Sequence, residues 1–235
     1  MSFIGRMFGK AVRMPPERQR RLDAWRALVE PDPGSAHSLL RLVVVDVESS
    51  GLDVHGDSLI AIGAMAIADS RIVYEASFHA VLRQDRASSV DNILLHGIGG
   101  SAQAGGEDPA EVLLHFLEFI GKSPLIGFHT PFDENMIRKA MRKYLGEEFK
   151  RLWLDLAWLA PALEPGHAEK LKNLDDWMAA FHIVNLRRHD ALSDALATGQ
   201  LFQILQHRAA AKGMRSASDL IEAARSQELL AKRRR

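Results

Sequence analysis

The chain of 235 residues contains no cysteine. This excludes disulfide frameworks, thiolate metal sites and cysteine nucleophiles, and it is compatible with a cytosolic protein. Long apolar runs are missing too: no stretch approaches the roughly 20 residues that a helix needs to cross a bilayer. The opening "MSFIGRMFGKAVRM" also lacks the continuous apolar region of a secretory signal. We therefore expect a cytoplasmic protein without a membrane span.

The chain has no net charge, yet its charges are distributed unevenly. Residues 1–30 hold seven Lys and Arg against three acids, and residues 205–235 hold eight against three, so residues 31–204 carry an excess of nine acids. The basic ends can be solvated helix faces, or arms that contact an anion such as nucleic acid. Because the acidic centre would repel a polyanion, such arms would supply part of the affinity for it.

The pattern of apolar residues and turn signals predicts alternating strands and helices. Strands are expected at 41–48, 58–68 and 71–82, the last two forming a hairpin, and shorter ones at 123–128 and 151–154. Helices are expected within 1–30 and at about 89–98, 108–121, 133–146, 155–163, 172–181, 190–211 and 216–231. Since a hairpin pairs antiparallel strands and helical crossovers join parallel ones, this order predicts an α/β layered domain with a mixed sheet.

The stretch "RLVVVDVESSGLD" ends a buried strand with two acids, Asp46 and Glu48. Side chains two residues apart point to the same side of a strand, so these carboxylates would lie close together. Such a pair is costly unless a positive group lies between them. The alternative is that the strand has ended and both acids lie in a solvated loop. In the next predicted strand, Gly63 indicates a close approach of backbones within the sheet.

Acids and a histidine also occur at the starts of two predicted helices. Asp133 stands where a helix follows a short strand, which is a position typical of a helix cap. His189 and Asp194 belong to "RRHDALSDALAT". On one continuous helix they would lie about 140° apart, so they converge only if His189 lies in the preceding loop. Taken singly, each of these residues can be a cap or a solvated group.

Other candidate residues fit structural roles. Asp155, Asp175 and Asp176 are expected to be helix caps or first-turn acids. The segment "GIGGSA", residues 97–102, has the letters of a dinucleotide-binding motif, but it follows a helical segment rather than a strand. We expect this segment to be a mobile loop.

Taken together, three motifs resemble those of the histidine-subtype DEDD (DEDDh) 3′→5′ exonucleases, a family that includes proofreading subunits of bacterial DNA polymerases, ribonuclease T and oligoribonuclease. The matching residues are Asp46 and Glu48 in "VVVDVESSGLD", Phe132 and Asp133 in "PFDENM", and His189, Asp190, Ala191, Asp194 and Ala195 in "HDALSDALAT". The resemblance covers about residues 41–207. Two departures from the common motifs are Ser49-Ser50 in place of two threonines, and Phe128-His129-Thr130 in place of His-Asn-Ala.

The resemblance implies a ribonuclease H-like fold, in which three layers place a central mixed five-stranded sheet between helices. It also implies two divalent metal ions, Mg²⁺ or Mn²⁺, which favour oxygen ligands. The implied metal ligands, which are also catalytic, are four carboxylates, those of Asp46, Glu48, Asp133 and Asp194. His189 is then the general base that accepts a proton from the attacking water. The implied substrate contacts are Ser49, Ser50, Gly51, His129 and Phe132.

The expected function is the metal-dependent removal of nucleoside 5′-monophosphates from the free 3′ end of DNA or RNA. The basic ends lie outside the resemblance and suit docking to a DNA polymerase, as in an accessory proofreading subunit. An alternative from another class is a catalytically silent nucleic-acid-binding or polymerase-docking module with the same fold. We expect an exonuclease domain at 37–210, preceded by a basic helical extension at 1–36 and followed by a basic helical tail at 211–235.

Overall fold

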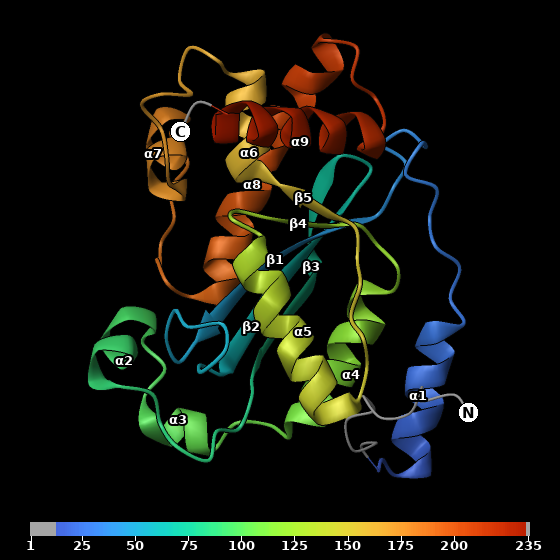
Figure 1. Cartoon of the computed structure of the whole chain (residues 1–235), viewed down its shortest axis with the longest axis vertical. Helices are drawn as coiled ribbons and strands as arrows, with labels where there is room; N and C mark the ends of the chain where they lie inside the picture. Colours follow the sequence, from blue (N-terminus) through green and yellow to red (C-terminus); the bar gives the residue numbers. More distant parts are fainter. Residues whose placement is uncertain (1–12, 234–235) are drawn as a thin grey trace, which may run out of the picture.

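A mixed sheet of five strands, in the order β3-β2-β1-β4-β5, forms the centre of the computed structural model, which describes residues 13–233 (Figure 1). The strands are β1 (Leu42–Ser49), β2 (Leu59–Ala68), β3 (Arg71–Val81), β4 (Leu125–Gly127) and β5 (Trp153–Asp155). β1 and β3 both pair with β2 in antiparallel fashion, whereas β4 pairs in parallel with β1 and β5. The predicted mixed sheet is therefore confirmed, and β1 lies at its centre.

Helices cover both faces of this sheet. They are α1 (Pro16–Arg26), α2 (Val90–His96), α3 (Gly100–Ala104), α4 (Pro109–Ile120), α5 (Pro131–Leu145), α6 (Leu156–Leu163), α7 (Leu174–Ala180), α8 (Ala191–Ala211) and α9 (Ala217–Arg233). Local signals in the sequence set several ends. The Asp108 carboxylate caps α4 by accepting from the backbone of Ala110 and Glu111, and Gly146 ends α5 with a φ of 63°.

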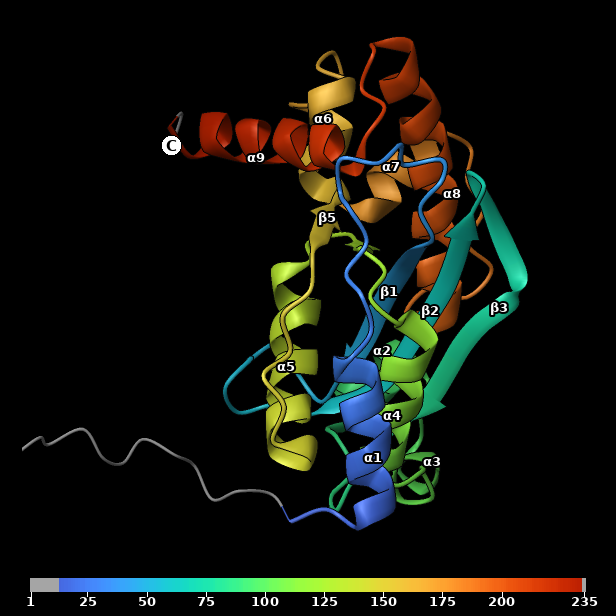
Figure 2. The same ribbon diagram turned by 90° about the vertical axis from the view of Figure 1, so that its right-hand side faces the viewer.

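Alternation along β1 divides the core into two apolar layers. Val44 packs with the helices α6 to α9 on one face, while Val43 and Val45 pack with α1, α4 and α5 on the other. Figure 2 shows α5 and α8 on opposite sides of the strands. Because both faces are covered by apolar helix surfaces, β1 is buried along its apolar run. The arrangement has the three layers of the ribonuclease H-like fold.

The N-terminal part of the described chain packs on the body. The helix predicted within 1–30 is observed as α1, and its part over 1–12 lies outside the described residues. Trp25 is buried, and its indole Nε1 donates a 2.7 Å hydrogen bond to the Gly121 carbonyl. Arg18 and Arg21 form ion pairs of 2.6 Å with Glu111 on α4. These arginines therefore contact the protein's own acids.

The C-terminal helix α9 packs against α6 and β5 through buried residues that include Leu220, Ile221 and Ala224. Basic residues before it also make internal contacts: Arg208 pairs with Glu164, and Lys212 donates to the Leu163 carbonyl. The domain limits at 36 and 210 and the contacts of the basic ends with nucleic acid stay predictions. Among residues 13–233, no helix is both long and apolar enough to cross a membrane.

Gly63 on β2 lies where a helix meets the sheet. It pairs in register with Asp46, and a Cβ at this position would come within 2.2–2.4 Å of backbone atoms of Ala191 and Leu192. The prediction of a close backbone approach is therefore confirmed, and the approaching segment is the first turn of α8. The missing side chain lets this turn lie directly against the strand that neighbours β1.

The prediction of a loop at residues 97–102 is wrong for its second half, because α3 begins at Gly100. Gln103 within this helix is fully buried. Its amide nitrogen donates to the Ile98 carbonyl at 2.8 Å and to the Ser88 hydroxyl at 2.9 Å, and its amide oxygen accepts from the Ser88 backbone. The glycine-rich sequence has no apolar periodicity that would predict a helix. The segment is held instead by the hydrogen bonds of one buried side-chain amide, that of Gln103.

Candidate active site

Three carboxylates meet at the end of the central strand. Asp46 and Glu48 lie on β1, and Asp194 lies in the first turn of α8. One carboxylate oxygen of each lies within 4.8 Å of the other two. Asp46 and Glu48 are half-buried and Asp194 is buried, so the alternative of a solvated loop is wrong. The acids that the sequence placed 146 to 148 residues apart are thus brought together by the contact of α8 with the sheet.

The carboxyl pKa values reflect this crowding. Burial raises the pKa of Asp46 well above its ordinary value, and the charges of Asp133, Asp194 and Glu48 raise it further. Burial, followed by repulsion from Asp194 and Asp190, raises the pKa of Glu48 to about 7. Each ionised carboxylate therefore disfavours the ionisation of its neighbours. A cation placed among them would relieve that repulsion.

Asp133 lies in the first turn of α5 with a buried side chain, and it is outside the group of three carboxylates whose oxygens lie within 4.8 Å of one another. Burial raises its pKa well above the ordinary value of an aspartate; hydrogen bonds with the backbone oppose this shift, and the charges of Asp155 and Glu48 add to it. The N-terminal turn of α5 follows β4, which is parallel to β1, so both elements deliver their acids to the same edge of the sheet. Asp133 is thus electrostatically part of the site.

Asp155 organises the turn that leads into α5. As predicted, it caps a helix, because its carboxylate accepts from the Ala157 backbone at the start of α6. The same carboxylate also accepts from the backbone nitrogens of His129 at 2.9 Å and Thr130 at 3.2 Å. Position in the sequence predicted the cap but not the second contact. Asp155 therefore holds the turn from which Asp133 projects.

His189 lies in the loop before α8, which begins at Ala191 with Asp190 as its cap. The His189 backbone has a φ of 60°, a left-handed conformation that is uncommon outside glycine. Its backbone nitrogen donates a 3.0 Å hydrogen bond to a carboxylate oxygen of Asp194. The turn thus places His189 and Asp194 together, which one continuous helix would not do. The condition for their convergence is therefore met.

Arg188 is a site residue that the motifs did not identify. Its guanidinium contacts Asp194 at 2.5 Å and Asp175, on α7, at 2.5 Å. The amide nitrogen of Asn185 donates to the other oxygen of Asp194. Arg188 also lowers the pKa values of Asp46 and Glu48 by its charge, against the larger effects of burial and acidic neighbours. The only sequence signal was a basic residue directly before His189.

The five residues predicted to contact substrate lie around this cluster. Ser49 is the last residue of β1, and Ser50 and Gly51 follow it; the Ser49 hydroxyl donates to the Gly51 carbonyl at 2.7 Å and the Ser50 hydroxyl donates to Asp57 at 2.8 Å. His129 is exposed in the turn before α5, with a φ of 63°. Phe132 is half-buried and packs against the apolar layer under α5. Their contacts with substrate stay predictions.

The fold and the acidic cluster define the class of protein. A central strand that carries two acids, next to helix starts that carry two more, is the arrangement of a nuclease with a ribonuclease H-like fold. Two solved structures share this fold. Escherichia coli exonuclease I in complex with a dT13 oligonucleotide has a TM-score of 0.65 and 16% identity, over 73% of this chain and 42% of that one. Exonuclease X in complex with 5′ overhanging duplex DNA has a TM-score of 0.61 and 20% identity, over 78% of this chain and 99% of that one.

The family follows from the sequence comparison. The family model described as "Exonuclease" (RNase_T) matches residues 43–202, and the chain belongs to this family. The chain is 31% identical over 160 residues to the PolC-type DNA polymerase III of Thermotoga petrophila, covering 68% of this chain but only 11% of that protein. It is 29% identical over 172 residues to the DNA polymerase III subunit epsilon of Rickettsia felis, covering 70% of this chain and 73% of that protein. The resemblance to DEDDh exonucleases is confirmed.

Proposed function

We propose that the protein is a 3′→5′ exonuclease that hydrolyses the terminal phosphodiester bond of a nucleic-acid strand and releases a nucleoside 5′-monophosphate. The observation that supports this most directly is the group of three carboxylate oxygens, from Asp46, Glu48 and Asp194, within 4.8 Å of one another in a chain of the exonuclease family. The hydrogen bond from the His189 backbone to Asp194 supports the proposal that this histidine is the proton acceptor.

The donor set fits hard divalent cations. We propose two such ions, Mg²⁺ or Mn²⁺, held by four carboxylates, those of Asp46, Glu48, Asp133 and Asp194. Oxygen-only ligands suit these ions. The pKa values of three of the acids are raised, first by burial and then by the charges of neighbouring acids, and a bound cation would oppose both effects. When bound, the ions would stabilise negative charge on the attacking and leaving oxygens.

The protein's own groups would position the strand and move the proton. His189 accepts a proton from the attacking water. The left-handed backbone conformation of this residue sets the direction in which its side chain leaves the backbone. The residues of two turns bind the terminal nucleotide: Ser49, Ser50 and Gly51 at the end of β1, and His129 and Phe132 at the start of α5. Asp155 keeps the second of these two turns in place through its contacts with the His129 and Thr130 backbone.

The named relatives suggest a partner as well as a substrate. Two of them are a PolC-type DNA polymerase III and a DNA polymerase III subunit epsilon. The chain spans about a tenth of the first and about three quarters of the second, so their assemblies are not transferred as a whole. We propose a nucleic acid with a free 3′ end as substrate, a DNA polymerase as a protein partner, and the cytoplasm as the location.

The test uses the purified protein with single-stranded DNA and RNA oligomers labelled at the 5′ end, in Mg²⁺, Mn²⁺ or EDTA, with products resolved at nucleotide resolution. We expect a ladder that shortens from the 3′ end, inhibition by a 3′-phosphate, and no cleavage of a closed circle. The Asp194→Asn variant is the control for contaminating nucleases. Binding of the oligomers without any cleavage would instead support the silent binding module.

A further inference from the structure

A basic groove lies between α5 and the loop that joins β1 to β2. Its volume is about 400 Å³, and four cations of α5 line it together with His55 of the loop; they are Arg138, Lys139, Arg142 and Lys143. On a helix, positions four apart lie one turn above each other, so 138 and 142, and likewise 139 and 143, form two adjacent columns. The basic side chains thus follow the long axis of α5.

Most of this charge is not neutralised by the protein. Arg142 pairs with Glu148 at 2.6 Å, but Arg138, Lys139 and Lys143 have no carboxylate within 4.0 Å among residues 13–233. The arginines of α1 that face α4 behave differently, since Arg18 and Arg21 are each paired with acids of the body. Arg138 and Lys139 interact with Glu134 and Asp53 only at longer range than an ion pair, so their charge is available to an external anion.

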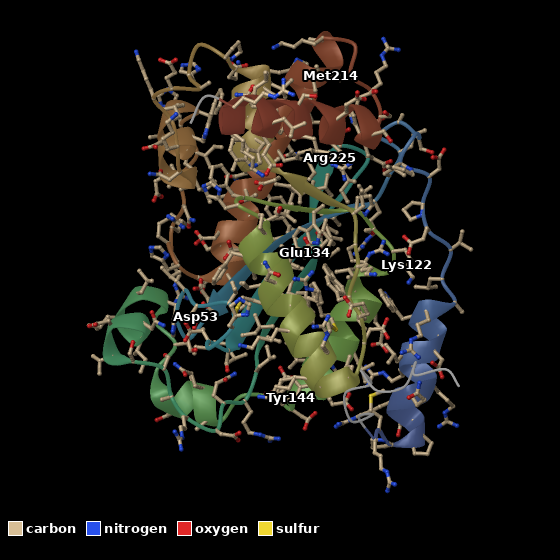
Figure 3. The ribbon with its side chains drawn as sticks, in the orientation of Figure 1. Asp53, Lys122, Glu134, Tyr144, Met214 and Arg225 are labelled. Carbon is tan, nitrogen blue, oxygen red and sulfur yellow. The ribbon has the colours of Figure 1, made fainter. Side chains whose placement is uncertain are left out.

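One of these cations holds the loop that forms the other wall. The Lys139 ammonium donates to the His55 carbonyl and, at 2.6 Å, to the Asp57 carbonyl. The loop is also closed internally, because Asp57 accepts from the Asp53 backbone at 2.8 Å. Figure 3 shows Asp53 in this loop beside α5, with Glu134 in the first turn of the helix and Tyr144 in its last. The groove therefore has two fixed walls.

The groove lies farther along two segments that also carry residues of the candidate active site, and none of the four site carboxylates lines it. The loop leaves β1 after Ser49, the residue that follows Glu48, and α5 carries Asp133 in its first turn. With a rise of 1.5 Å per residue, Lys139 lies about 9 Å and Lys143 about 15 Å along the helix from Asp133. In a strand with about 3.4 Å between nucleotides, this distance corresponds to roughly three to four nucleotides.

We propose that this groove binds the phosphate backbone of the substrate strand, roughly three to four nucleotides from its 3′ end. The proposal rests on the proposed exonuclease function and adds a binding site that the acidic cluster does not supply. The fit is one of charge: a polyanion repelled by the acidic site meets Arg138 and Lys143, which have no carboxylate within 4.0 Å among residues 13–233, on the helix that carries Asp133. Asp53 and Glu148 border the groove, so phosphate contacts rather than a broad positive field would provide the affinity.

The experiment compares a double variant, Arg138→Gln with Lys143→Gln, with a control of equal charge change, Arg71→Gln with Arg86→Gln. Both control arginines are exposed, on β3 and in the segment that follows it, and lie outside the basic ends. Lys139 is left intact because it holds the loop. The KM is measured for a single-stranded DNA of about 12 nucleotides and for a dinucleotide, at several salt concentrations, and melting temperatures verify that both variants are folded.

Each lost phosphate contact lowers the slope of log affinity against log salt by about 0.7 on a single strand. Two lost contacts should therefore raise the KM for the longer DNA about sevenfold more at about 50 mM salt than at about 200 mM. The preference for the longer DNA over the dinucleotide should also fall. The proposal is overturned if the groove variant matches the control, or if its KM rises equally for both substrates. If the wild-type protein hydrolyses neither substrate, the proposed function fails first.

Discussion

Replacing Glu48 by glutamine should stabilise the metal-free protein above neutral pH. In the folded protein, burial and the charges of Asp194 and Asp190 raise the pKa of Glu48 to about 7, from an ordinary value of 4.5. This difference corresponds to about 3 kcal/mol that ionised Glu48 costs the folded state relative to the unfolded chain. Glutamine keeps the shape of the side chain and removes this cost.

The sign of the effect fixes its pH window. Because the folded-state pKa is raised, the folded protein binds the proton more tightly, and the cost is absent below about pH 4.5. It grows as the pH rises towards 7 and is complete above that. The Glu48→Gln variant should therefore match the wild type near pH 4.5. At pH 8 its unfolding free energy should be larger by about 3 kcal/mol, or about 6 to 12 °C in melting temperature for a chain of this size.

Thermal melts in EDTA at several pH values provide the assay, with Glu75→Gln as control because Glu75 is exposed on β3. Adding Mg²⁺ or Mn²⁺ should reverse the order, since the wild type gains stability from binding the metal and the variant loses a ligand. An equal gain at pH 5 and pH 8, or no gain at either, would refute the argument that acidic repulsion in this cluster opposes folding.

Other changes test the remaining parts of the site. Asp46→Asn should lower turnover by orders of magnitude while the fold survives, as circular dichroism and the reaction rate together would reveal. His189→Ala should slow the chemical step by about 10² to 10⁴-fold yet keep the metal-induced rise in melting temperature; an unchanged rate and pH profile would contradict a general base. Gly63→Ala should cost about 1–3 kcal/mol and weaken Mn²⁺ binding by displacing the first turn of α8, unlike Gly166→Ala in open space. Arg188→Gln should tighten Mn²⁺ binding in titration calorimetry because it removes a competing cation; unchanged affinity would exclude that competition.

Local patterns predicted much of the fold, and the resemblance to a family selected the carboxylates of the site. The apolar run before Asp46 and the two-residue spacing to Glu48 are properties of one strand, so alternation alone places both acids on one side. A proline and glycine frame α5, and a cap precedes α8, so the starts that carry Asp133 and Asp194 were also readable. For these residues, placement in the site depends on position within a single strand or helix, which the local sequence determines.

Long-range partners were not predictable in the same way. Arg188 contacts Asp175 on one side and Asp194 on the other, and nothing in their spacing distinguishes this pair from solvated charges. The ion pairs of Arg21 join α1 to a helix 90 or more residues later. Which acid meets which base depends on how helices pack, and it becomes visible only when the layers are assembled.

The residues of the site lie on elements whose local unfolding requires different free energies. Asp46 and Glu48 sit on the central strand, where backbone pairing with β2 spans both residues and breaks only when the sheet itself comes apart. His189 sits in the loop directly before α8, where its backbone nitrogen bonds to Asp194. Partial unfolding would therefore free the histidine loop while the strand acids stay in place. Hydrogen exchange should show slow amides on β1 and fast ones around residue 189, so the protein would lose the proposed proton acceptor reversibly and still retain the strand that carries Asp46 and Glu48.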